Sequence, residues 1–336
     1  MQIHILVVGV GSVGKRHARN LNALGCNISC VDLNIKRLDE LSQEIRIIGQ
    51  FDTIDSAFRA GQNYDGAVIA CPTGFHSEAI HQLAKFKLPI LLEKPVAKSL
   101  YDAMEMYQIS IEKDFPVLLG YTWRWWKPLQ RVQELIKFNT IGSIRHVHFN
   151  MSAHLADWHP WEPYQSFFMA SAAQGGGALL DESHWIDMMI LFFGMPKKIL
   201  GSVEKISDLE IETDDNVDVI AFYPDRLRVI IHLDLYGRPH EKSIRFIGEG
   251  GTLVWTAEPN RIKVCVSSEQ TWEEEVFCCA RNDMFFSVAQ EFINLINGDF
   301  VNWTCQLKDG LSVMKVIEMI RISSQEGRIV GIEELT

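Results

Sequence analysis

The sequence predicts an α/β protein in which a doubly wound parallel sheet with helices on both faces precedes an α/β domain built on an open, mostly antiparallel sheet. Three observations predict this fold class. The length of 336 residues suits two domains. Strands and helices alternate in the first third of the chain, and short strand-like segments follow one another in its second half. The pattern changes after about Tyr121, so we expect domains at residues 1–121 and 122–336.

The first domain begins with an apolar strand. Residues Ile3–Val8 are apolar and β-branched apart from His4, which is typical of a strand buried on both faces of a parallel sheet. Helices and strands then alternate, which indicates parallel strands joined by crossover helices. The expected helices are Lys15–Leu24, Ile35–Glu44, His76–Phe86 and Leu100–Glu112, and the further strands are Asn27–Val31, Ala67–Ala70, Pro89–Leu92 and Val117–Leu119.

The second domain is richer in strands. Turn signals such as Pro224-Asp225 and Gly250-Gly251 separate short alternating segments, which favours an antiparallel meander with one packed and one open face. The expected strands are Ile144–Ser152, Ile199–Ile206, Val217–Phe222, Leu227–Leu235, Ser243–Ile247, Thr252–Thr256 and Ile262–Ser267. The expected helices are Pro128–Lys137, a block at Gly177–Phe193, Met284–Asn297 and Leu307–Ser323.

Composition excludes several classes of partner. The net charge of −11 repels phosphate backbones, so we expect no nucleic-acid partner. The first residues, MQIHILVVGVG, lack a basic region and a cleavage site, and no apolar run is long enough to span a bilayer. The seven cysteines form no CxxC pair and are typical of reduced thiols. We therefore expect a cytoplasmic protein without a membrane partner.

A glycine-rich turn follows the first strand. Residues 9–14 read GVGSVG and open a helix, which is the setting of a dinucleotide-binding loop. Gly9 allows the tight turn, Gly11 lets a pyrophosphate approach the backbone, and Gly14 lets helix and strand pack closely. The N–H groups of Ser12 and Val13 belong to the helix end that would face the phosphates. A plain glycine turn is the alternative.

An acidic residue closes the second expected strand. Asp32 lies 18 residues beyond Gly14, where a carboxylate can accept both hydroxyls of an adenosine ribose and repel a 2′-phosphate. This favours NAD. Lys36 and Arg37 follow closely and soften the preference, so NADP stays an alternative cofactor. Asp32 can also serve as a helix N-cap.

A lysine follows another strand of the same expected sheet. Glu93-Lys94-Pro95 comes after Pro89–Leu92, and the carboxyl ends of parallel strands are where open α/β sheets bind ligands. Lys94 can hydrogen-bond a substrate oxygen, and Pro95 would fix its approach, through a cis bond if one forms. A surface turn is the alternative, and from composition alone it would be preferred.

A polar stripe interrupts an apolar helix in the second domain. Asp181, His184 and Asp187 are spaced by three residues within GGGALLDESHWIDMMILFFG, which places them on one side of a helix. Such a face is costly to bury unless it is paired or used. We interpret Asp187 as a structural residue that binds backbone, and His184 as a functional one.

Taken in order, these motifs resemble the glucose–fructose oxidoreductase / inositol dehydrogenase / rhizopine catabolism (Gfo/Idh/MocA) family over nearly the whole chain. The combination of Glu-Lys-Pro with a later Gly-Gly-Gly, Asp and His carries most of the resemblance. The motifs are Gly9–Gly14, Pro72-Thr73 with His76, Glu93-Lys94-Pro95, Gly120 with Arg124 and Pro128, Gly175–Gly177 with Asp181 and His184, and Gly248 with Gly251-Thr252.

The resemblance implies an N-terminal Rossmann domain, and a hydride transfer between NAD or NADP and a sugar, sugar acid, inositol or nucleotide sugar. It implies that Lys94 is the catalytic lysine, that His184 exchanges the hydroxyl proton, and that Asp181 orients both. It also implies a homodimer or homotetramer formed through the open sheet. The residues expected to line the cofactor are Gly9, Gly11, Ser12, Val13, Gly14, Asp32, Arg37, Cys71, Pro72, Thr73, His76, Glu93 and Lys94.

The sequence departs from the family pattern in one place. Many members space the aspartate and the histidine by four residues, whereas Asp181 and His184 are three apart with a serine before the histidine. This form resembles members from bacterial surface-polysaccharide clusters. Which of Lys94, Asp181 and His184 is the terminal proton acceptor stays open.

Two aromatic segments are candidates for contact with the substrate. In residues 154–161, HLADWHPW, Trp158 and Trp161 can stack on a sugar ring and His154 can bond its hydroxyls. A merely packed loop is the alternative. The two histidines and Asp157 are potential metal ligands, but no further cysteine or carboxylate pattern supports a metal site there. Trp123 and Arg124 begin the second domain, where Arg124 can meet a carboxylate or phosphate of the substrate, or the cofactor. A packed domain junction is the alternative.

Two other functions remain open from the sequence. The family includes dinucleotide-binding regulators without catalysis, against which the joint presence of Lys94, Asp181 and His184 argues. A reductase of an unsaturated, non-sugar ring is the other alternative, and its activity would depend little on His184.

Overall fold

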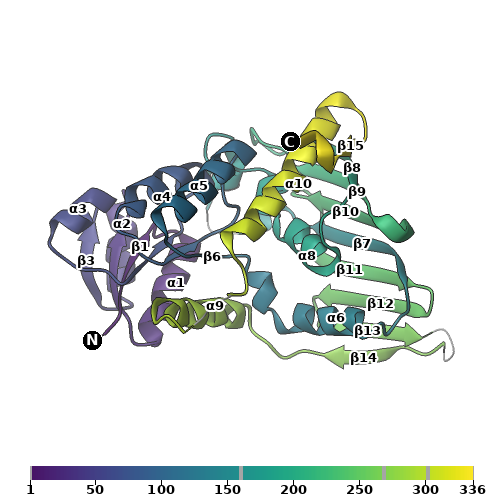
Figure 1. Ribbon diagram of the computed structural model, residues 1–336, viewed down its shortest axis with the longest axis horizontal. Coiled ribbons are helices and arrows are strands. Elements are labelled where there is room, and N and C mark those ends of the chain that lie inside the picture. Colours follow the sequence, from purple (N-terminus) through teal and green to yellow (C-terminus); the bar gives the residue numbers. More distant parts are fainter. Residues whose placement is uncertain (1, 159–161, 267–269, 300–302, 336) are drawn as a thin grey trace. The chain divides into compact units, whose positions relative to one another are not determined.

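The computed structural model describes residues 2–158, 162–266, 270–299 and 303–335, and divides into two compact units. Unit 1 comprises Met1–Trp125 and Arg281–Leu311, and unit 2 comprises Trp126–Ala280 and Ser312–Thr336 (Figure 1). In the described residues, no helix combines the length and the apolar character needed to cross a membrane.

Unit 1 contains a parallel sheet of six strands in the order β3-β2-β1-β4-β5-β6, and every neighbouring pair is parallel. This is a Rossmann arrangement, as predicted, and the strand order reverses direction between β1 and β4. Apart from the outermost β3, the strands are almost entirely buried because helices cover both faces. The strands are β1 (His4–Val8), β2 (Asn27–Val31), β3 (Ile47–Phe51), β4 (Gly66–Ile69), β5 (Ile90–Leu92) and β6 (Val117–Leu119).

Side chains cap the first turn of several helices of unit 1. The Thr53 hydroxyl accepts a hydrogen bond from Ser56 N at the start of α3, and the Ser99 hydroxyl accepts one from Asp102 N at the start of α5. The helices are α1 (Ser12–Ala23), α2 (Ile35–Ser42), α3 (Ile54–Arg59), α4 (His76–Ala84), α5 (Leu100–Lys113) and α9 (Arg281–Ile296). The sequence analysis did not predict β3 or α3.

Unit 1 also receives a late segment of the chain, Arg281–Leu311, which the sequence analysis assigned to the second domain. Helix α9 packs on α1, where the side chains of Asn20 and Asn282 exchange hydrogen bonds. Leu119 N donates to Cys305 O at 2.9 Å, beside the outermost strand β6. The segment therefore covers a helix face and a sheet edge that residues 1–125 would leave open.

Unit 2 is built on a sheet of nine strands in the order β14-β13-β12-β11-β7-β10-β9-β8-β15. It is mostly antiparallel, as predicted, but it is not a simple meander: β7 lies between β10 and β11 and runs parallel to β10. The strands are β7 (Ile144–Ser152), β8 (Lys198–Glu204), β9 (Asn216–Phe222), β10 (Arg228–Asp234), β11 (Glu241–Gly248), β12 (Gly251–Ala257), β13 (Asn260–Val266), β14 (Glu273–Val276) and β15 (Val330–Gly331).

One face of this sheet carries the core of unit 2. The fully buried Trp185 of α8 (His184–Phe193) meets Phe149 of β7 and Trp255 of β12. Helices α6 (Lys127–Lys137) and α10 (Leu307–Glu326) lie on the same face (Figure 1). On the opposite face, Leu200 and Ile247 keep 36% and 38% of their surface exposed. The prediction of one packed and one open face is confirmed.

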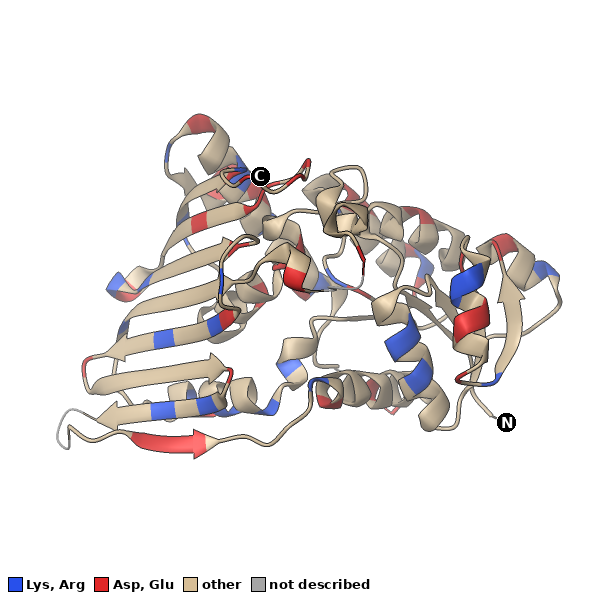
Figure 2. Cartoon of the chain, turned by 180° about the vertical axis from the view of Figure 1, so that it is seen from behind, with Lys and Arg blue, Asp and Glu red and all other residues tan. Residues whose placement is uncertain are grey.

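Charged residues mark the edge of this sheet at β14. The acidic run Glu273–Glu275 is typical of a solvated loop by its sequence, but in the structure it forms most of this exposed strand. Glu274 pairs with Arg261 and Lys263 of β13, so the red strand lies beside blue bands in Figure 2. Cross-strand pairs of opposite charge stabilise such an edge, and its charge discourages pairing with other chains.

Candidate cofactor and catalytic site

Four loops that carry predicted site residues leave the same edge of the unit 1 sheet. The strands are parallel, so the residues that follow β1, β2, β4 and β5 all lie at its carboxyl end. These residues are the glycine loop after β1, Asp32 after β2, Cys71–Thr73 after β4 and Glu93-Lys94 after β5. This is where open α/β sheets bind dinucleotides.

The glycine loop has the shape that a pyrophosphate requires. A Cβ added to Gly14 would lie 1.9 Å from Gly9 O, so Gly14 allows α1 to pack against the turn. A Cβ on Gly11 would meet nothing within 4 Å, so the space beside this residue is open. Within the described chain no side chain caps the first turn of α1, where Ser12 and Val13 lie. Its N–H groups are therefore available to an anion, and the loop fits the phosphates of a dinucleotide.

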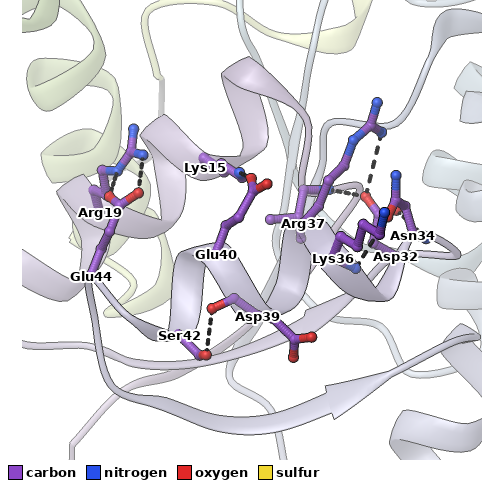
Figure 3. A network of polar contacts seen from close by, with 11 residues as sticks. Lys15, Arg19, Asp32, Asn34, Lys36, Arg37, Asp39, Glu40, Ser42 and Glu44 are labelled. Carbon is purple, nitrogen blue, oxygen red and sulfur yellow. Dashed lines mark hydrogen bonds and ion pairs between the residues drawn. The ribbon is translucent and has the colours of Figure 1, made fainter.

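Asp32 is held by backbone rather than by a helix end. Its carboxylate accepts hydrogen bonds from Val10 N at 2.7 Å and Asn34 N at 2.8 Å. The N-cap of α2 is Asn34, which accepts from Lys36 N, so the alternative role of Asp32 as N-cap is wrong. Arg37 approaches Asp32 to 4.0 Å (Figure 3). Asp32 thus joins the glycine loop to the β2 loop, as a ribose-binding carboxylate would.

The loop after β4 contacts the glycine loop directly. A Cβ on Gly9 would lie 2.5 Å from Cys71 N, and Gly9 has a φ of +88°. Burial raises the pKa of the Cys71 thiol to about 12, so this thiol is neutral at pH 7. Pro72 precedes Thr73, which is buried at the start of a 3₁₀ turn. Cys71, Pro72 and Thr73 stay predicted cofactor neighbours.

His76 turns inward. Its Nδ1 lies 3.0 Å from Pro95 O and 3.1 Å from Val96 O, and its Nε2 lies 3.0 Å from Cys71 O. The ring is 1% exposed, and burial lowers its pKa despite the surrounding carbonyl groups. His76 therefore ties the β4 loop to the loop that carries Lys94, and its predicted contact with the cofactor remains untested.

Lys94 follows β5, and its bond to Pro95 is cis. The preceding residue, Glu93, is 7% exposed and uses both carboxylate oxygens inside the protein. Oε1 lies 2.6 Å from Nε2 of His17, and Oε2 accepts a hydrogen bond from Lys94 N at 3.2 Å. The surface-turn alternative is therefore wrong for Glu93, whose carboxylate braces the catalytic candidate beside it. His17 was not predicted as a site residue, because nothing local in the sequence links it to a residue 76 positions later.

The polar stripe of unit 2 differs from the single helix that we expected. Residues 182–183 form a turn that separates α7 (Ala178–Asp181) from α8, so Asp181 ends one helix and His184 begins the next. Asp181 is 8% exposed and Asp187 is fully buried. The other end of α7 is anchored by a residue that lies far along the chain.

Asp214 provides that anchor. Its carboxylate accepts a hydrogen bond from Leu179 N at 2.8 Å, and a Cβ on Gly177 would lie 2.2 Å from Asp214 Oδ1. Burial raises the pKa of this carboxyl, while the Leu179 N–H favours its charged form. The glycine run before Asp181 thus lets an acidic residue cap a short helix. The acidic run Glu210–Asp215 is typical of a solvated loop by its sequence, but Asp215 within it is fully buried.

The residues predicted for the substrate have different surroundings. Arg124 is 8% exposed; its Nη1 donates to Thr304 O at 3.0 Å and lies 3.5 Å from Asp309. Trp123 is equally buried. These contacts lie within unit 1, and the substrate roles of Arg124 and Trp123 stay predictions.

The loop after β7 contains three residues predicted to contact the substrate: His154, Trp158 and Trp161. His154 accepts a hydrogen bond from Ala156 N, and Arg238 binds both carboxylate oxygens of Asp157 at 2.7 and 2.9 Å. Trp158 has a buried indole Nε1 without a hydrogen-bond partner in the described chain. Trp161 lies outside the described residues.

Comparisons with known proteins agree with this architecture. Residues 3–121 match the model of an oxidoreductase family with an NAD-binding Rossmann fold, and residues 129–254 match the GFO/IDH/MocA C-terminal domain. A 2,7-anhydro-N-acetylneuraminate hydratase of Escherichia coli is 27% identical over 54% of this chain and 47% of its own length. A D-apiose dehydrogenase of Rhizobium rhizogenes is 28% identical over 40% of each chain. The chain thus spans about half the length, or less, of these two relatives.

Solved structures with the same fold match along the whole chain. Levoglucosan dehydrogenase in complex with NADH has a TM-score of 0.85 at 16% identity, covering 99% of both chains. A myo-inositol 2-dehydrogenase from Lactobacillus plantarum has a TM-score of 0.82 at 18% identity, covering 98% of this chain and 99% of that one. At such identities the likeness shows the fold alone. Through its two matching family models, the chain belongs to the Gfo/Idh/MocA family of oxidoreductases.

Proposed function

We propose that this chain is an NAD-dependent dehydrogenase or reductase that transfers a hydride between the nicotinamide and a hydroxyl or carbonyl carbon of a sugar derivative. One observation carries the proposal: within unit 1, the open glycine loop, Asp32 and Lys94 leave the same edge of one parallel sheet. That placement suits a cofactor whose phosphates and ribose are held at one end and whose reactive ring reaches the lysine loop.

The relatives support the substrate class. The similar proteins named D-apiose dehydrogenase and levoglucosan dehydrogenase are named for sugar-type substrates. We propose a sugar, sugar acid, inositol or nucleotide sugar for this chain. Because the Asp-Glu-Ser-His form of residues 181–184 resembles members from surface-polysaccharide clusters, we place the activity in surface-polysaccharide metabolism without ranking these four substrate classes.

In the proposed mechanism each residue has a separate task. Bound NAD supplies the hydride acceptor. Lys94 donates a hydrogen bond to the reacting oxygen and stabilises its developing negative charge. His184 takes the hydroxyl proton during oxidation and returns it during reduction, and Asp181 orients these two groups. Trp158, whose indole N–H has no protein acceptor in the described chain, is our candidate for a hydrogen bond to a substrate hydroxyl.

Turnover measurements with a panel of these substrates and both cofactors test the proposal. Lys94→Ala and His184→Ala should each lower kcat by about 10²–10⁴-fold, while NADH binding should persist. Lys85→Ala is the matched control, because Lys85 pairs with Asp55 at 3.4 Å on the surface of the same unit. A wild-type protein that binds NADH and turns over no substrate would support the regulator instead. Reduction of a C=C or C=N bond that survives His184→Ala would support the unsaturated-ring alternative.

We further propose that the protein forms a homodimer, or a tetramer built from such dimers, through the open face of the unit 2 sheet. One cross-sheet row on this face contains four apolar side chains, a large number for a face left to water. The row runs Leu200, Ile220, Ile230, His148, Arg245, Val254, Lys263 and Glu274.

Charge on the same face favours a second copy of this chain as its occupant. Arg245, Arg261 and Lys263 line a hollow of about 310 Å³ beside Trp272 on the β11–β13 side. Asp218 lies in the same cross-sheet row as Arg261 but on the β9 side. A two-fold axis parallel to the strands would bring opposite ends of two sheets together, and with them opposite charges.

Light scattering after size-exclusion chromatography tests the assembly. Ile230→Lys should produce monomers, whereas Ile111→Lys, at a residue 56% exposed on α5, should not. Arg261→Glu and Asp218→Arg should each weaken the dimer, and the double variant should restore it. A monomeric wild type would refute the assembly, and a double variant weaker than either single one would refute the proposed orientation.

A further inference from the structure

A buried histidine–glutamate pair joins the helix of the glycine loop to the loop of Lys94. His17 lies on α1, three residues after Gly14, and is fully buried. Its Nε2 lies 2.6 Å from Oε1 of Glu93, which is itself 7% exposed. The other oxygen of Glu93 accepts a hydrogen bond from the backbone N–H of Lys94. The mechanism proposed above assigns nothing to His17.

The surroundings of the pair indicate a built site. A Cβ on Gly120 would lie 2.9 Å from Oε1 of Glu93, so the glycine leaves room for the carboxylate. The ring of Phe285 stands edge-on to His17 with centroids 5.7 Å apart. The carboxylate is therefore excluded from most of the water, and a buried carboxylate needs hydrogen-bond donors to remain there. His17 and Lys94 N supply them.

The hydrogen bonds also fix the tautomer of the imidazole. Nε2 faces a carboxylate oxygen and therefore carries a proton. Nδ1 is buried without a hydrogen-bond partner in the described chain, and a bare acceptor there costs less than an unpaired N–H would. A ring that carries its proton on Nε2 satisfies both conditions. In this form the ring has a single task, which is to hold Glu93.

The same loop is held from its other side. His76 binds the carbonyl oxygens of Pro95 and Val96. Residues 93–96 are thus clamped between two buried imidazoles, one on α1 and one on α4. The backbone of Lys94 lies between the two clamps, so the position of its amine depends on both.

We propose that His17 is a positioning residue for Lys94: it orients Glu93, and Glu93 fixes the peptide nitrogen of the lysine. This inference rests on the catalytic role proposed for Lys94. Because α1 also starts at the phosphate loop, the pair makes the placement of the lysine depend on the helix that would hold the cofactor. A displacement of about 1 Å at a reacting group can cost about 100-fold in rate.

Four single variants and one double variant test the proposal. His17→Leu removes the donor, His17→Gln keeps an amide N–H that can reach Glu93, and Glu93→Gln removes the carboxylate. The matched control is His81→Leu, because His81 and Glu105 form an exposed pair at 3.2 Å in the same unit. The readouts are kcat, KM, the Kd for NADH, and the pH-dependent rate at which a small acylating reagent labels Lys94, followed by peptide mass spectrometry. All are measured well below each variant's melting temperature.

We expect His17→Leu to lower kcat by about 100-fold with little change in the Kd for NADH, and to change the labelling profile of Lys94. His17→Gln should recover part of both, and combining His17→Leu with Glu93→Gln should cost no more than the larger single effect. The control should match the wild type. A folded His17→Leu variant with the kcat and the Lys94 labelling of the wild type would overturn the proposal. So would a variant whose only change is a lower melting temperature. If the wild type has no activity, the proposed function fails, while the labelling comparison still decides whether His17 positions Lys94.

Discussion

Gly11→Ala separates cofactor binding from folding. Gly11 has φ −74° and ψ −167°, a conformation open to alanine, and its added Cβ would meet nothing within 4 Å. At this N-cap position alanine lowers the free energy of unfolding by about 0.5–1 kcal/mol relative to glycine. The lower conformational entropy of the unfolded alanine variant raises it by about 0.4–1 kcal/mol. The melting temperature should therefore stay within about 2 °C of the wild type.

NADH affinity should fall in the same variant. The methyl group would occupy the space that the pyrophosphate needs, and would move it away from the N–H groups of α1. Hydrogen bonds to a charged group contribute about 1.5–3 kcal/mol each, so the loss of one raises the Kd by about tenfold or more. Fluorescence titration with NADH and differential scanning fluorimetry measure the two effects.

Gly14→Ala is the contrasting variant. Its Cβ would lie 1.9 Å from Gly9 O, so backbone must move and we expect a loss of about 1–3 kcal/mol in stability. If Gly11→Ala binds NADH as tightly as the wild type, the glycine loop does not hold the phosphates. If the melting temperature of Gly11→Ala is as low as that of Gly14→Ala, the space beside Gly11 is not open.

Three further predictions concern other residues. Asp32→Ser should raise the affinity for NADPH relative to NADH by about tenfold, because Arg37 at 4.0 Å would then face a 2′-phosphate without a competing carboxylate; an unchanged ratio of the two Kd values would contradict this. The hydrogen bond with Asp234, together with a second nearby carboxylate, raises the pKa of His232 to about 9 from 6.5. Stability from this group is full below pH 6.5 and is lost as pH rises through about 9, so the urea midpoint should fall more steeply with pH in the wild type than in His232→Gln; parallel curves would exclude this linkage. Asp215→Ala should cost about 2–4 kcal/mol in urea unfolding, since the fully buried carboxylate accepts two backbone N–H groups; a loss below about 1 kcal/mol would mean that water replaces it.

The sequence was sufficient for the elements whose local pattern is strong. The apolar strands β1, β4 and β5 and the glycine turn lie where they were predicted, because burial on both faces demands apolar residues throughout. Strand β3 was missed because Gly49-Gln50 interrupts its apolar run at the sheet edge. Strand β14 was missed because its exposed sequence, Glu-Glu-Glu-Val, is held by pairing across the sheet rather than by local preference.

Long-range order lay beyond the sequence pattern. Nothing local indicates that β7 inserts between β10 and β11, since strand order depends on which distant pairs bury the most surface. The same holds for the candidate site. Asp32 and Lys94 were predicted from their places after strands, whereas the His17–Glu93 pair joins residues from two distant elements. Helical periodicity reveals neither the break between Asp181 and His184 nor the contact of Asp214 with Leu179 N. That Lys94 and His184 act on one substrate oxygen stays a prediction.

The return of residues 281–311 to unit 1 has a consequence for synthesis on the ribosome. When residue 125 has emerged, the outer edge of β6 still lacks Gln306 and the α1 face still lacks Phe285. Residues 126–280 must be translated first, which takes on the order of 10 s at about 5–20 residues per second. During that interval an unpaired parallel edge and an apolar helix face are exposed to other nascent chains. The nucleotide-binding unit can therefore be completed only after residues 126–280 of unit 2 have been translated.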